Sequence, residues 1–183
     1  MKEIVSNNYS VWIGEDSLSR LDVSNYSKVG ILVDENTKRD CLPKLSQLEN
    51  SIIIDIKSGE EYKNINTCNF IWEQISEHNF DRDSLLINLG GGVIGDMGGF
   101  CASTYKRGID FIQIPTTLLA MVDASVGGKL GVDFNGLKNQ KGLFSNPKAV
   151  LINPEFLQTL PEDQIKSGFA EVVKHALISD KNL

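Results

Sequence analysis

Short apolar segments alternate with helical patterns along residues 11–115, and this alternation constrains the fold more than any other feature of the sequence. Segments with the composition of strands lie at 11–13, 29–33, 52–54, 84–89 and 111–114. Apolar residues at roughly helical spacing lie between them, at 37–48, 64–78 and 93–105. The alternation predicts an α/β fold, with a mainly parallel Rossmann-like sheet and flanking helices. Ligands of such sheets bind beyond the carboxyl ends of the strands.

A glycine-rich turn, GGGVIGD at 90–96, directly follows the predicted strand at 84–89 and opens a predicted helix. It satisfies G-x-G-x-x-G in the context that this motif requires, where the backbone can approach a pyrophosphate at a helix N-terminus. A tight turn without a ligand is the alternative. An ordinary dinucleotide fold has an acidic residue about 20 positions further on, but here Asp110 begins a strand. Asp34 and Glu60, after earlier strands, are better placed for ribose hydroxyls.

The charge balance limits the kind of partner. The chain has 183 residues and a formal net charge of −6, which argues against a nucleic-acid surface but allows a small anionic substrate. Its three cysteines include no C-x-x-C pair, which is typical of reduced thiols. No segment has the pattern of a signal peptide or a membrane helix. We therefore predict a soluble, cytoplasmic protein that binds neither membrane nor nucleic acid.

Two threonines and a long irregular segment follow the predicted strand at 111–114. The hydroxyls of Thr116 and Thr117 either face the ligand crevice or cap a helix. Residues 124–148 are rich in Gly, Asn and Lys, and we interpret them as a long ordered loop or a hairpin.

A set of charged and amide side chains lies in and around this segment. MVDASVGGK at 121–129 places the carboxylate of Asp123 before a Gly-Gly turn that presents Lys129, and Lys138 and Asn139 follow. Two lysines and an amide on a glycine-rich loop indicate an anion pocket. Ordinary surface lysines on a solvated loop are the alternative.

The last predicted helix carries charge within an apolar pattern, at GFAEVVKH (168–175). Glu171, Lys174 and His175 are spaced i, i+3 and i+4, so they share one face. Spacing alone makes Glu171 and His175 candidates for joint metal ligands, against the alternative of a surface ion pair. The chain has two histidines, too few for a usual catalytic zinc site.

Together these stretches resemble the 3-dehydroquinate synthases of the sugar-phosphate cyclase superfamily. The matching segments are GGGVIGD (90–96), YKRG (105–108), IPTTLLAMVDASVGGK (114–129), GLKN (136–139) and GFAEVVKH (168–175), with looser matches at VDENT (33–37) and SGEEYK (58–63). The resemblance implies a homodimeric lyase that uses NAD and a divalent metal ion, Zn²⁺ or Co²⁺. It also implies the reaction, conversion of 3-deoxy-D-arabino-heptulosonate 7-phosphate to 3-dehydroquinate and phosphate in the shikimate pathway, toward chorismate and aromatic amino acids.

The resemblance further implies roles for individual residues. Those along NAD, from adenosine through pyrophosphate to nicotinamide, would be Asp34, Asn36, Glu60, Lys63, Gly91, Gly92, Asp96, Thr116, Thr117, Asp123 and Lys138, with Phe156, Thr159, Leu160 and Gln164 closing over it. Those toward the substrate would be Lys129 and Asn139 at its phosphate, Arg107 at the phosphate of the neighbouring subunit, Lys174 at its hydroxyls, and Glu171 as a metal ligand.

The resemblance also implies a domain division. We expect an NAD-binding α/β domain over 1–153 and, over 154–183, the start of an α-helical metal and substrate domain whose remainder is absent. The co-ligands of Glu171 would then be two histidines beyond Leu183, which leaves His175 out of the metal site. We therefore expect the chain alone to lack turnover.

Three other functions fit part of the pattern. A related cyclase, of the valiolone or deoxy-inosose synthase type, would share the motifs. A nucleotide-binding module without catalysis would not need the charged set from Asp123 to Glu171. An iron-type alcohol dehydrogenase shares the architecture but requires further histidines and no phosphate site. Two departures from the family pattern, Leu130 in place of threonine and Lys141 in place of an apolar residue, would alter loop packing.

Overall fold

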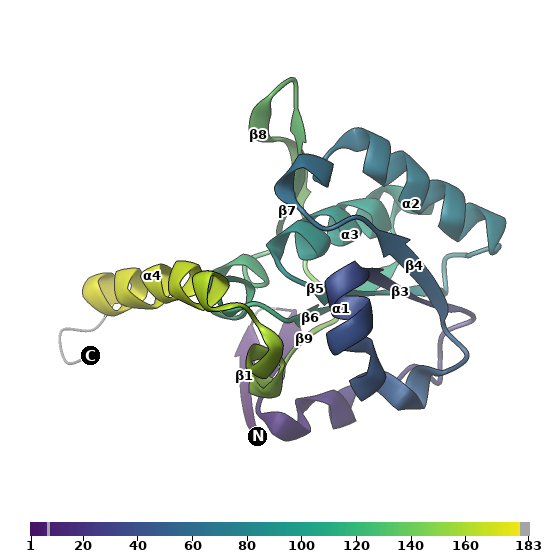
Figure 1. The fold of residues 1–183 in the computed structure, drawn as a ribbon. Coiled ribbons are helices and arrows are strands. Elements are labelled where there is room, and N and C mark those ends of the chain that lie inside the picture. The colour runs from purple at the N-terminus through teal and green to yellow at the C-terminus, as the bar shows by residue number, and fades with distance from the viewer. Residues whose placement is uncertain (7, 180–183) are drawn as a thin grey trace.

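The computed structural model describes residues 1–6 and 8–179, which fold around a seven-stranded, mostly parallel sheet (Figure 1). The strand order is β1-β2-β9-β6-β5-β3-β4; β1 pairs antiparallel with β2, and the other neighbours are parallel. The strands are β1 (Lys2–Ser6), β2 (Tyr9–Ile13), β3 (Val29–Asp34), β4 (Ile52–Ile56), β5 (Leu85–Gly90), β6 (Asp110–Pro115) and β9 (Ala149–Ile152). The α-helices are α1 (Glu35–Asp40), α2 (Ile65–Glu77), α3 (Gly92–Thr104) and α4 (Glu162–Ser179). The predicted α/β fold is confirmed.

Helical elements on both faces bury the central strands, which explains their apolar composition. All six residues of β5 are buried. Alternate side chains point to opposite faces, so that Ile31 and Val33 join one core and Leu32 joins the other. Residues of three short helices, η1 (Glu15–Arg20), η2 (Leu42–Leu48) and η6 (Pro154–Thr159), complete the first core, and residues of α2 and α3 complete the second.

The single helix predicted over 37–48 is wrong. The structure has two helices there, α1 and the 3₁₀ helix η2, with non-helical angles at Leu45. Pro43 lies at the start of η2, and proline lacks the backbone N–H that a continuing α-helix needs.

Two strands, β1 and β9, are not among those predicted from the sequence. Four of the five residues of β1 are exposed, so the strand has no buried face to mark it. β9 is a four-residue run, AVLI, and such a short apolar run does not separate strand from helix. β9 nevertheless joins β2 to β6 and so completes the sheet.

The segment predicted as a loop or hairpin is a hairpin, β7 (Lys129–Phe134) with β8 (Leu137–Phe144), and it projects from the body (Figure 1). Its turn, at Asn135 and Gly136, has positive φ at both positions, as Asn-Gly hairpin turns require. Both departures from the family pattern are accommodated here. Leu130 is buried against Gly99, and the Lys141 ammonium lies 3.7 Å from the Phe134 ring centroid.

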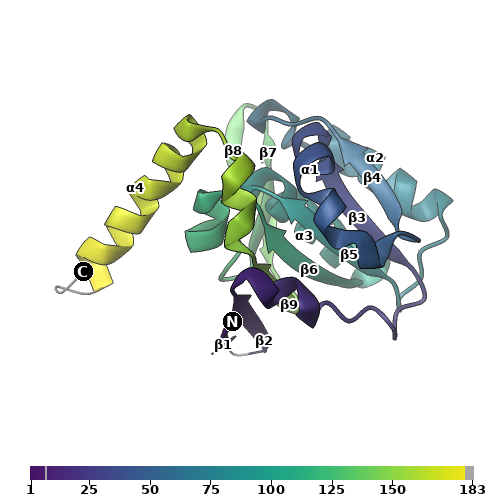
Figure 2. The same ribbon diagram turned by 60° about the horizontal axis from the view of Figure 1, so that its bottom comes forward.

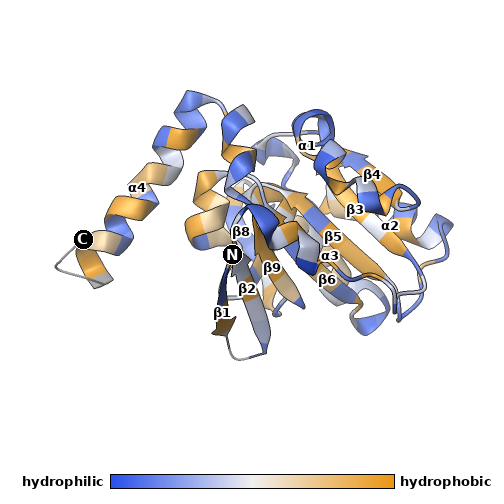
Figure 3. Cartoon of the chain, turned by 90° about the horizontal axis from the view of Figure 1, so that it is seen from below, coloured by the Kyte–Doolittle hydropathy of each residue, from blue (hydrophilic) through white to orange (hydrophobic). Residues whose placement is uncertain are grey.

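Helix α4 extends from the body in a different direction from the hairpin (Figure 1 and Figure 2). Apolar bands run along it (Figure 3), and Phe169, Val173, Leu177 and Ile178 are exposed. Within the described part of the chain, no helix combines the length and apolar character needed to cross a membrane.

Candidate functional site

The glycine turn lies where the parallel strands end. The register pairs Asp34 with Ile56 and Gly90 with Pro115, so the carboxyl ends of these strands lie at one edge of the sheet. β5 ends at Gly90 and α3 begins at Gly92, which confirms the predicted strand–glycine–helix order. No side chain caps α3 at Gly91, so the turn leaves backbone N–H groups at a helix N-terminus, where anions bind.

The three glycines of the turn serve different purposes. A Cβ at Gly90 would collide with the Ile94 side chain, and one at Gly91 would lie 3.0 Å from the Thr117 side chain. A Cβ at Gly92 would meet only the Ala124 methyl group, at 3.5 Å. Packing therefore explains why position 90 is a glycine, but it does not explain the glycine at position 92.

Thr116 and Thr117 lie beside this turn. Thr116 is buried, and its N–H donates to the Gly90 carbonyl at 3.0 Å. The Thr117 hydroxyl accepts from the Ala120 N–H at 3.2 Å. Thr117 thus has the capping role that the sequence offered as the alternative, in a position that also contacts the turn.

The acidic residues after the earlier strands are already engaged. An Asp34 carboxylate oxygen accepts from the N–H groups of Asn36 and Thr37 and so caps α1. Glu60, at the start of the short helix η3 (Glu60–Tyr62), pairs with Lys138 of the hairpin at 2.9 Å. The hydrogen bond to Glu60, together with the negative charge of that carboxylate, raises the pKa of Lys138.

Lys63 connects η3, α3 and the hairpin. Its ammonium donates to Asp96 Oδ2 at 2.6 Å and to Asn139 Oδ1 at 2.7 Å, and the residue is 4% exposed. Burial raises the pKa of Asp96, and the neighbouring ammonium of Lys63 partly offsets that rise. A buried ion pair of this kind is stable only while both partners remain.

A cavity of about 520 Å³ gathers several predicted site residues. It is lined by Asp96 of α3, Asp123, and Lys129 and Asn139 of the hairpin. One ammonium and one amide thus meet two carboxylates beside the glycine turn. The anion-pocket interpretation expected a second lysine, Lys138, but Lys138 pairs with Glu60 and does not line this cavity. A second hollow, of about 590 Å³ and lined by Glu15, Lys44 and others, contains none of the predicted site residues.

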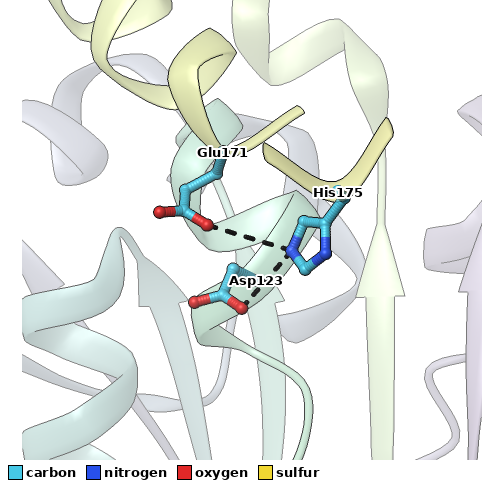
Figure 4. A group of neighbouring side chains, drawn as sticks. All are labelled: Asp123, Glu171 and His175. Atoms are coloured by element: carbon cyan, nitrogen blue, oxygen red, sulfur yellow. Dashed lines mark ion pairs between the residues drawn. The ribbon is translucent and has the colours of Figure 1, made fainter. Parts of the chain in front are cut away.

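Next to this cavity, α4 meets η5 (Ala120–Ala124), a single π-helical turn (Figure 4). His175 Nε2 lies 3.5 Å from Asp123 Oδ1 and 3.9 Å from Glu171 Oε2. One ligand atom from each of the three residues falls within 4.8 Å of the others. Carboxylate oxygen and imidazole nitrogen are zinc ligands at about 2.0–2.2 Å, a bond length that places neighbouring ligand atoms about 3.4 Å apart.

The three residues therefore suit a divalent cation. Lys174 Nζ also contacts Glu171 Oε2, at 2.8 Å, and this contact raises the pKa of Lys174. Sequence spacing identified Glu171 and His175 as neighbours. It did not predict that Asp123 lies beside them, because only the packing of α4 on η5 brings that carboxylate to them.

Other predicted residues lie apart from this cavity. Arg107 is exposed at the far end of α3, which is about 20 Å long at 1.5 Å per residue. Phe156 is 1% exposed and packs in the core, so any contact with NAD would involve its backbone. The Thr159 hydroxyl donates to the Phe156 carbonyl. Leu160 follows η6, and Gln164 lies in the first turn of α4.

Comparisons with known proteins show which family the chain is similar to. A family model described as 3-dehydroquinate synthase N-terminal matches residues 53–167. A 3-dehydroquinate synthase of Parabacteroides distasonis is 48% identical over 168 residues, covering 90% of this chain and 47% of the relative. That of Campylobacter concisus is 48% identical over 186 residues, covering 100% of this chain and 52% of the relative. The chain spans about half the length of the curated relatives it matches.

Solved structures show the same fold. A 2-deoxy-scyllo-inosose synthase complexed with carbaglucose-6-phosphate, NAD⁺ and Co²⁺ has a TM-score of 0.89 at 25% identity, over 100% of this chain and 53% of that chain. A 2-epi-5-epi-valiolone synthase from Streptomyces hygroscopicus subsp. jinggangensis, with NAD⁺ and Zn²⁺ bound, has a TM-score of 0.85 at 26% identity, over 100% and 53%. An iron-containing alcohol dehydrogenase has a TM-score of 0.70 at 18% identity, over 97% and 54%, a likeness that shows the fold alone.

Proposed function

The chain belongs to the 3-dehydroquinate synthase family, and we propose that it supplies the NAD- and phosphate-binding part of that enzyme. The proposed reaction converts 3-deoxy-D-arabino-heptulosonate 7-phosphate to 3-dehydroquinate and phosphate. Bound NAD would accept and return a hydride during this reaction. The rest of the proposal concerns the side chains and backbone groups that this chain provides.

The glycine turn is the proposed site of the NAD pyrophosphate. Its backbone N–H groups at Gly91 and Gly92 would donate to pyrophosphate oxygens, since the turn opens α3 without a side-chain cap. Thr116 and Thr117 would line the next part of the cofactor, because both lie against the turn. On this layout, the other predicted NAD-contacting residues extend along the same edge of the sheet.

The cavity beside the turn is the proposed site of the substrate phosphate. The Lys129 ammonium and the Asn139 amide N–H groups would donate to phosphate oxygens, and would stabilise the negative charge on the leaving phosphate. Arg107 faces solvent at the far end of α3, which is compatible with a contact to a neighbouring subunit.

Glu171 is the proposed ligand of the divalent metal ion. The resemblance assigns Asp123 to NAD and leaves His175 out of the metal site, but the donor atoms of both lie within 4.8 Å of that of Glu171, so we propose them as further donors from this chain. A metal ion there would polarise a substrate hydroxyl. Lys174, which pairs with Glu171, would be released to contact substrate hydroxyls once the ion neutralises that carboxylate. The donor set, two carboxylates and one imidazole, is of the type that Zn²⁺ and Co²⁺ accept.

One observation carries the proposal: a cation-bearing cavity lies directly beside the uncapped glycine turn and next to a cluster of metal-type donors. Calorimetric titration of the chain with inorganic phosphate tests it. Lys129→Met should weaken binding on the order of tenfold, because a charged hydrogen bond is lost. Lys148→Met is the matched control, since Lys148 pairs with Asp110 where β6 begins, at the opposite edge of the sheet. Equal affinities in wild type and Lys129→Met would reject the phosphate site.

The alternatives fit less well. A bare nucleotide-binding module does not explain why Asp123, Lys129 and Asn139 line one cavity. The cyclases of known structure are 25% and 26% identical to this chain, against 48% for the 3-dehydroquinate synthases named above. Turnover assays of the enzyme that contains this chain, with either the 3-dehydroquinate synthase substrate or a glucose-6-phosphate-like substrate, separate the two kinds of cyclase. The domain division, the homodimer, the cytoplasmic location and the inactivity of the chain alone stay predictions.

A further inference from the structure

Lys63 is the most deeply buried cation that the structure places at the proposed site. It is 4% exposed, yet its ammonium has two close acceptors, a carboxylate oxygen of Asp96 and the side-chain oxygen of Asn139. Two of its three N–H donors are therefore used within the protein. The third N–H donor remains for the contact with NAD that the sequence resemblance implies.

The connection between the η3 segment and the hairpin runs in both directions. Lys63 reaches from the η3 segment to Asn139 of the hairpin, whereas Lys138 of the hairpin reaches back to Glu60 of η3. The backbone adds a further link, because the Asp133 N–H donates to the Lys63 carbonyl at 2.9 Å. The η3 segment thus holds Asn139, the hairpin residue at the proposed phosphate site.

The orientation of the Asn139 amide follows from the chemistry of its partner. A lysine ammonium donates hydrogen bonds and accepts none, so the amide atom that faces it must be the oxygen. The amide NH₂ group then remains for other contacts, and Asn139 lines the cavity that also contains Lys129. An amide turned the other way would present an oxygen to the anion and repel it.

We infer that Lys63 is a positioning residue, which holds the Asn139 amide with its N–H groups available to the phosphate. The inference rests on the proposed function, since it assigns a determinant of that same phosphate site. Asn139 has a φ of 53°, a conformation that strains most residues, and its N–H is fixed by the Asp133 carboxylate at 2.7 Å. Because the backbone is held in this way, the hydrogen bond from Lys63 to the side-chain oxygen determines how the amide is oriented.

A double-mutant cycle on phosphate affinity tests the inference. Removing Lys63 alone would leave Asp96 buried without its partner, so the cycle uses Asp96→Asn as its reference. Lys63→Met is then added with and without Asn139→Ala. Lys63→Met should weaken phosphate binding on the order of tenfold when Asn139 is present, and less than about twofold when Asn139 is alanine.

The cycle separates positioning from other roles. A loss of equal size in both backgrounds would mean that Lys63 acts through general charge or overall structure, and would overturn the inference. Thermal unfolding of every variant verifies the fold, and Lys148→Met reports the effect of removing a distant positive charge. Phosphate binding that depends on Lys129 and Asn139 but not on Lys63 overturns this inference alone. A wild-type chain that binds no phosphate overturns the proposed function and the inference with it.

Discussion

The hairpin β7–β8 and the helix α4 both extend from the α/β body, but they are attached to it in different ways. The hairpin buries Leu130 and Val132 in the core, and Lys63 fastens it to α3 through Asp96. Helix α4 meets the body where the backbone at Gly168 lies against the segment before η5, and much of its apolar surface is exposed (Figure 3).

This difference divides the proposed site into two parts. The proposed phosphate cavity is lined by the anchored hairpin, by Asp96 of α3 and by Asp123 of η5, and none of the described residues of α4 lines it. The metal-type cluster joins Asp123 of the body to Glu171 and His175 of the lightly attached helix (Figure 4). Because the attachments are separate, substitutions should disturb one part without the other.

The largest effect is expected where α4 meets the body. A Cβ at Gly168 would lie 2.5 Å from the Leu119 backbone nitrogen, so Gly168→Leu should push α4 away and separate Glu171 from Asp123. Loss of outer-shell partners alone costs about 10–100-fold in metal affinity. We therefore expect a loss on the order of a hundredfold in Co²⁺ affinity, measured from the visible absorption of the bound ion.

Ala170→Leu is the control for this experiment, since Ala170 is exposed on the same helix. It should leave Co²⁺ affinity unchanged, and neither variant should alter phosphate affinity. A Gly168→Leu protein that binds Co²⁺ like the wild type would show that Asp123 does not share the ion with α4.

A substitution within the hairpin should have the opposite selectivity. A Cβ at Gly142 would collide with the Leu130 carbonyl, so Gly142→Ala should disrupt the pairing of β7 with β8. We expect phosphate affinity to fall on the order of tenfold and the free energy of unfolding to fall by about 1–3 kcal/mol. Co²⁺ affinity should stay within about twofold, as strain in the hairpin does not reach α4.

Gly136→Asn is the matched control for Gly142→Ala. Nothing lies within 4 Å of a Cβ at Gly136, and asparagine accepts its positive φ. If the two variants weaken phosphate binding equally, the anchored hairpin is not what shapes the cavity.

The sequence predicted the parts of the site that depend on local order and left out those that depend on packing. The glycine turn after β5 follows from neighbouring residues, and it is where the sequence places it. Lys63 and Asn139 are 76 positions apart in the sequence, and Asp123 and His175 are 52 positions apart. No spacing rule connects such positions, because strand order and helix docking bring them together. Strand β1 was not predicted for a different reason: its exposed residues lack the alternation that marks a half-buried strand.

Helix α3 allows a third comparison, between a glycine needed for packing and one proposed for a ligand. A Cβ at Gly98 would collide with the Asn88 side chain beneath α3, so Gly98→Ala should destabilise the fold by about 1–3 kcal/mol. A Cβ at Gly92 would lie at ordinary contact distance from Ala124 alone, so Gly92→Ala should not destabilise the fold and should raise the free energy of unfolding by about 0.4–1 kcal/mol.

If Gly92 serves the NAD pyrophosphate, Gly92→Ala should instead weaken NAD binding, on the order of fivefold, as measured by calorimetry. Full NAD affinity in this variant would remove Gly92 from the cofactor site. Loss of stability would show that the turn is more tightly packed than the contacts indicate.

The smallest effect is expected in the pH dependence of the anchored part. Burial raises the pKa of Asp96 above its ordinary 3.8, despite the nearby Lys63 ammonium. The folded protein therefore binds this proton more tightly than the unfolded chain does. The resulting stabilisation is present below pH 3.8 and is lost as pH rises through the folded-state pKa.

Asp96→Asn removes this titration and keeps the shape of the side chain. The difference in unfolding free energy between wild type and Asp96→Asn should therefore move against the wild type as pH rises from about 4 toward neutrality. Urea unfolding at several pH values measures it, and Asp133→Asn, on the exposed side of the same hairpin link, is the control. A difference that moves in favour of the wild type would mean that the charge of Lys63 outweighs burial. The hairpin would then be anchored by an ion pair stronger than the burial of Asp96 indicates.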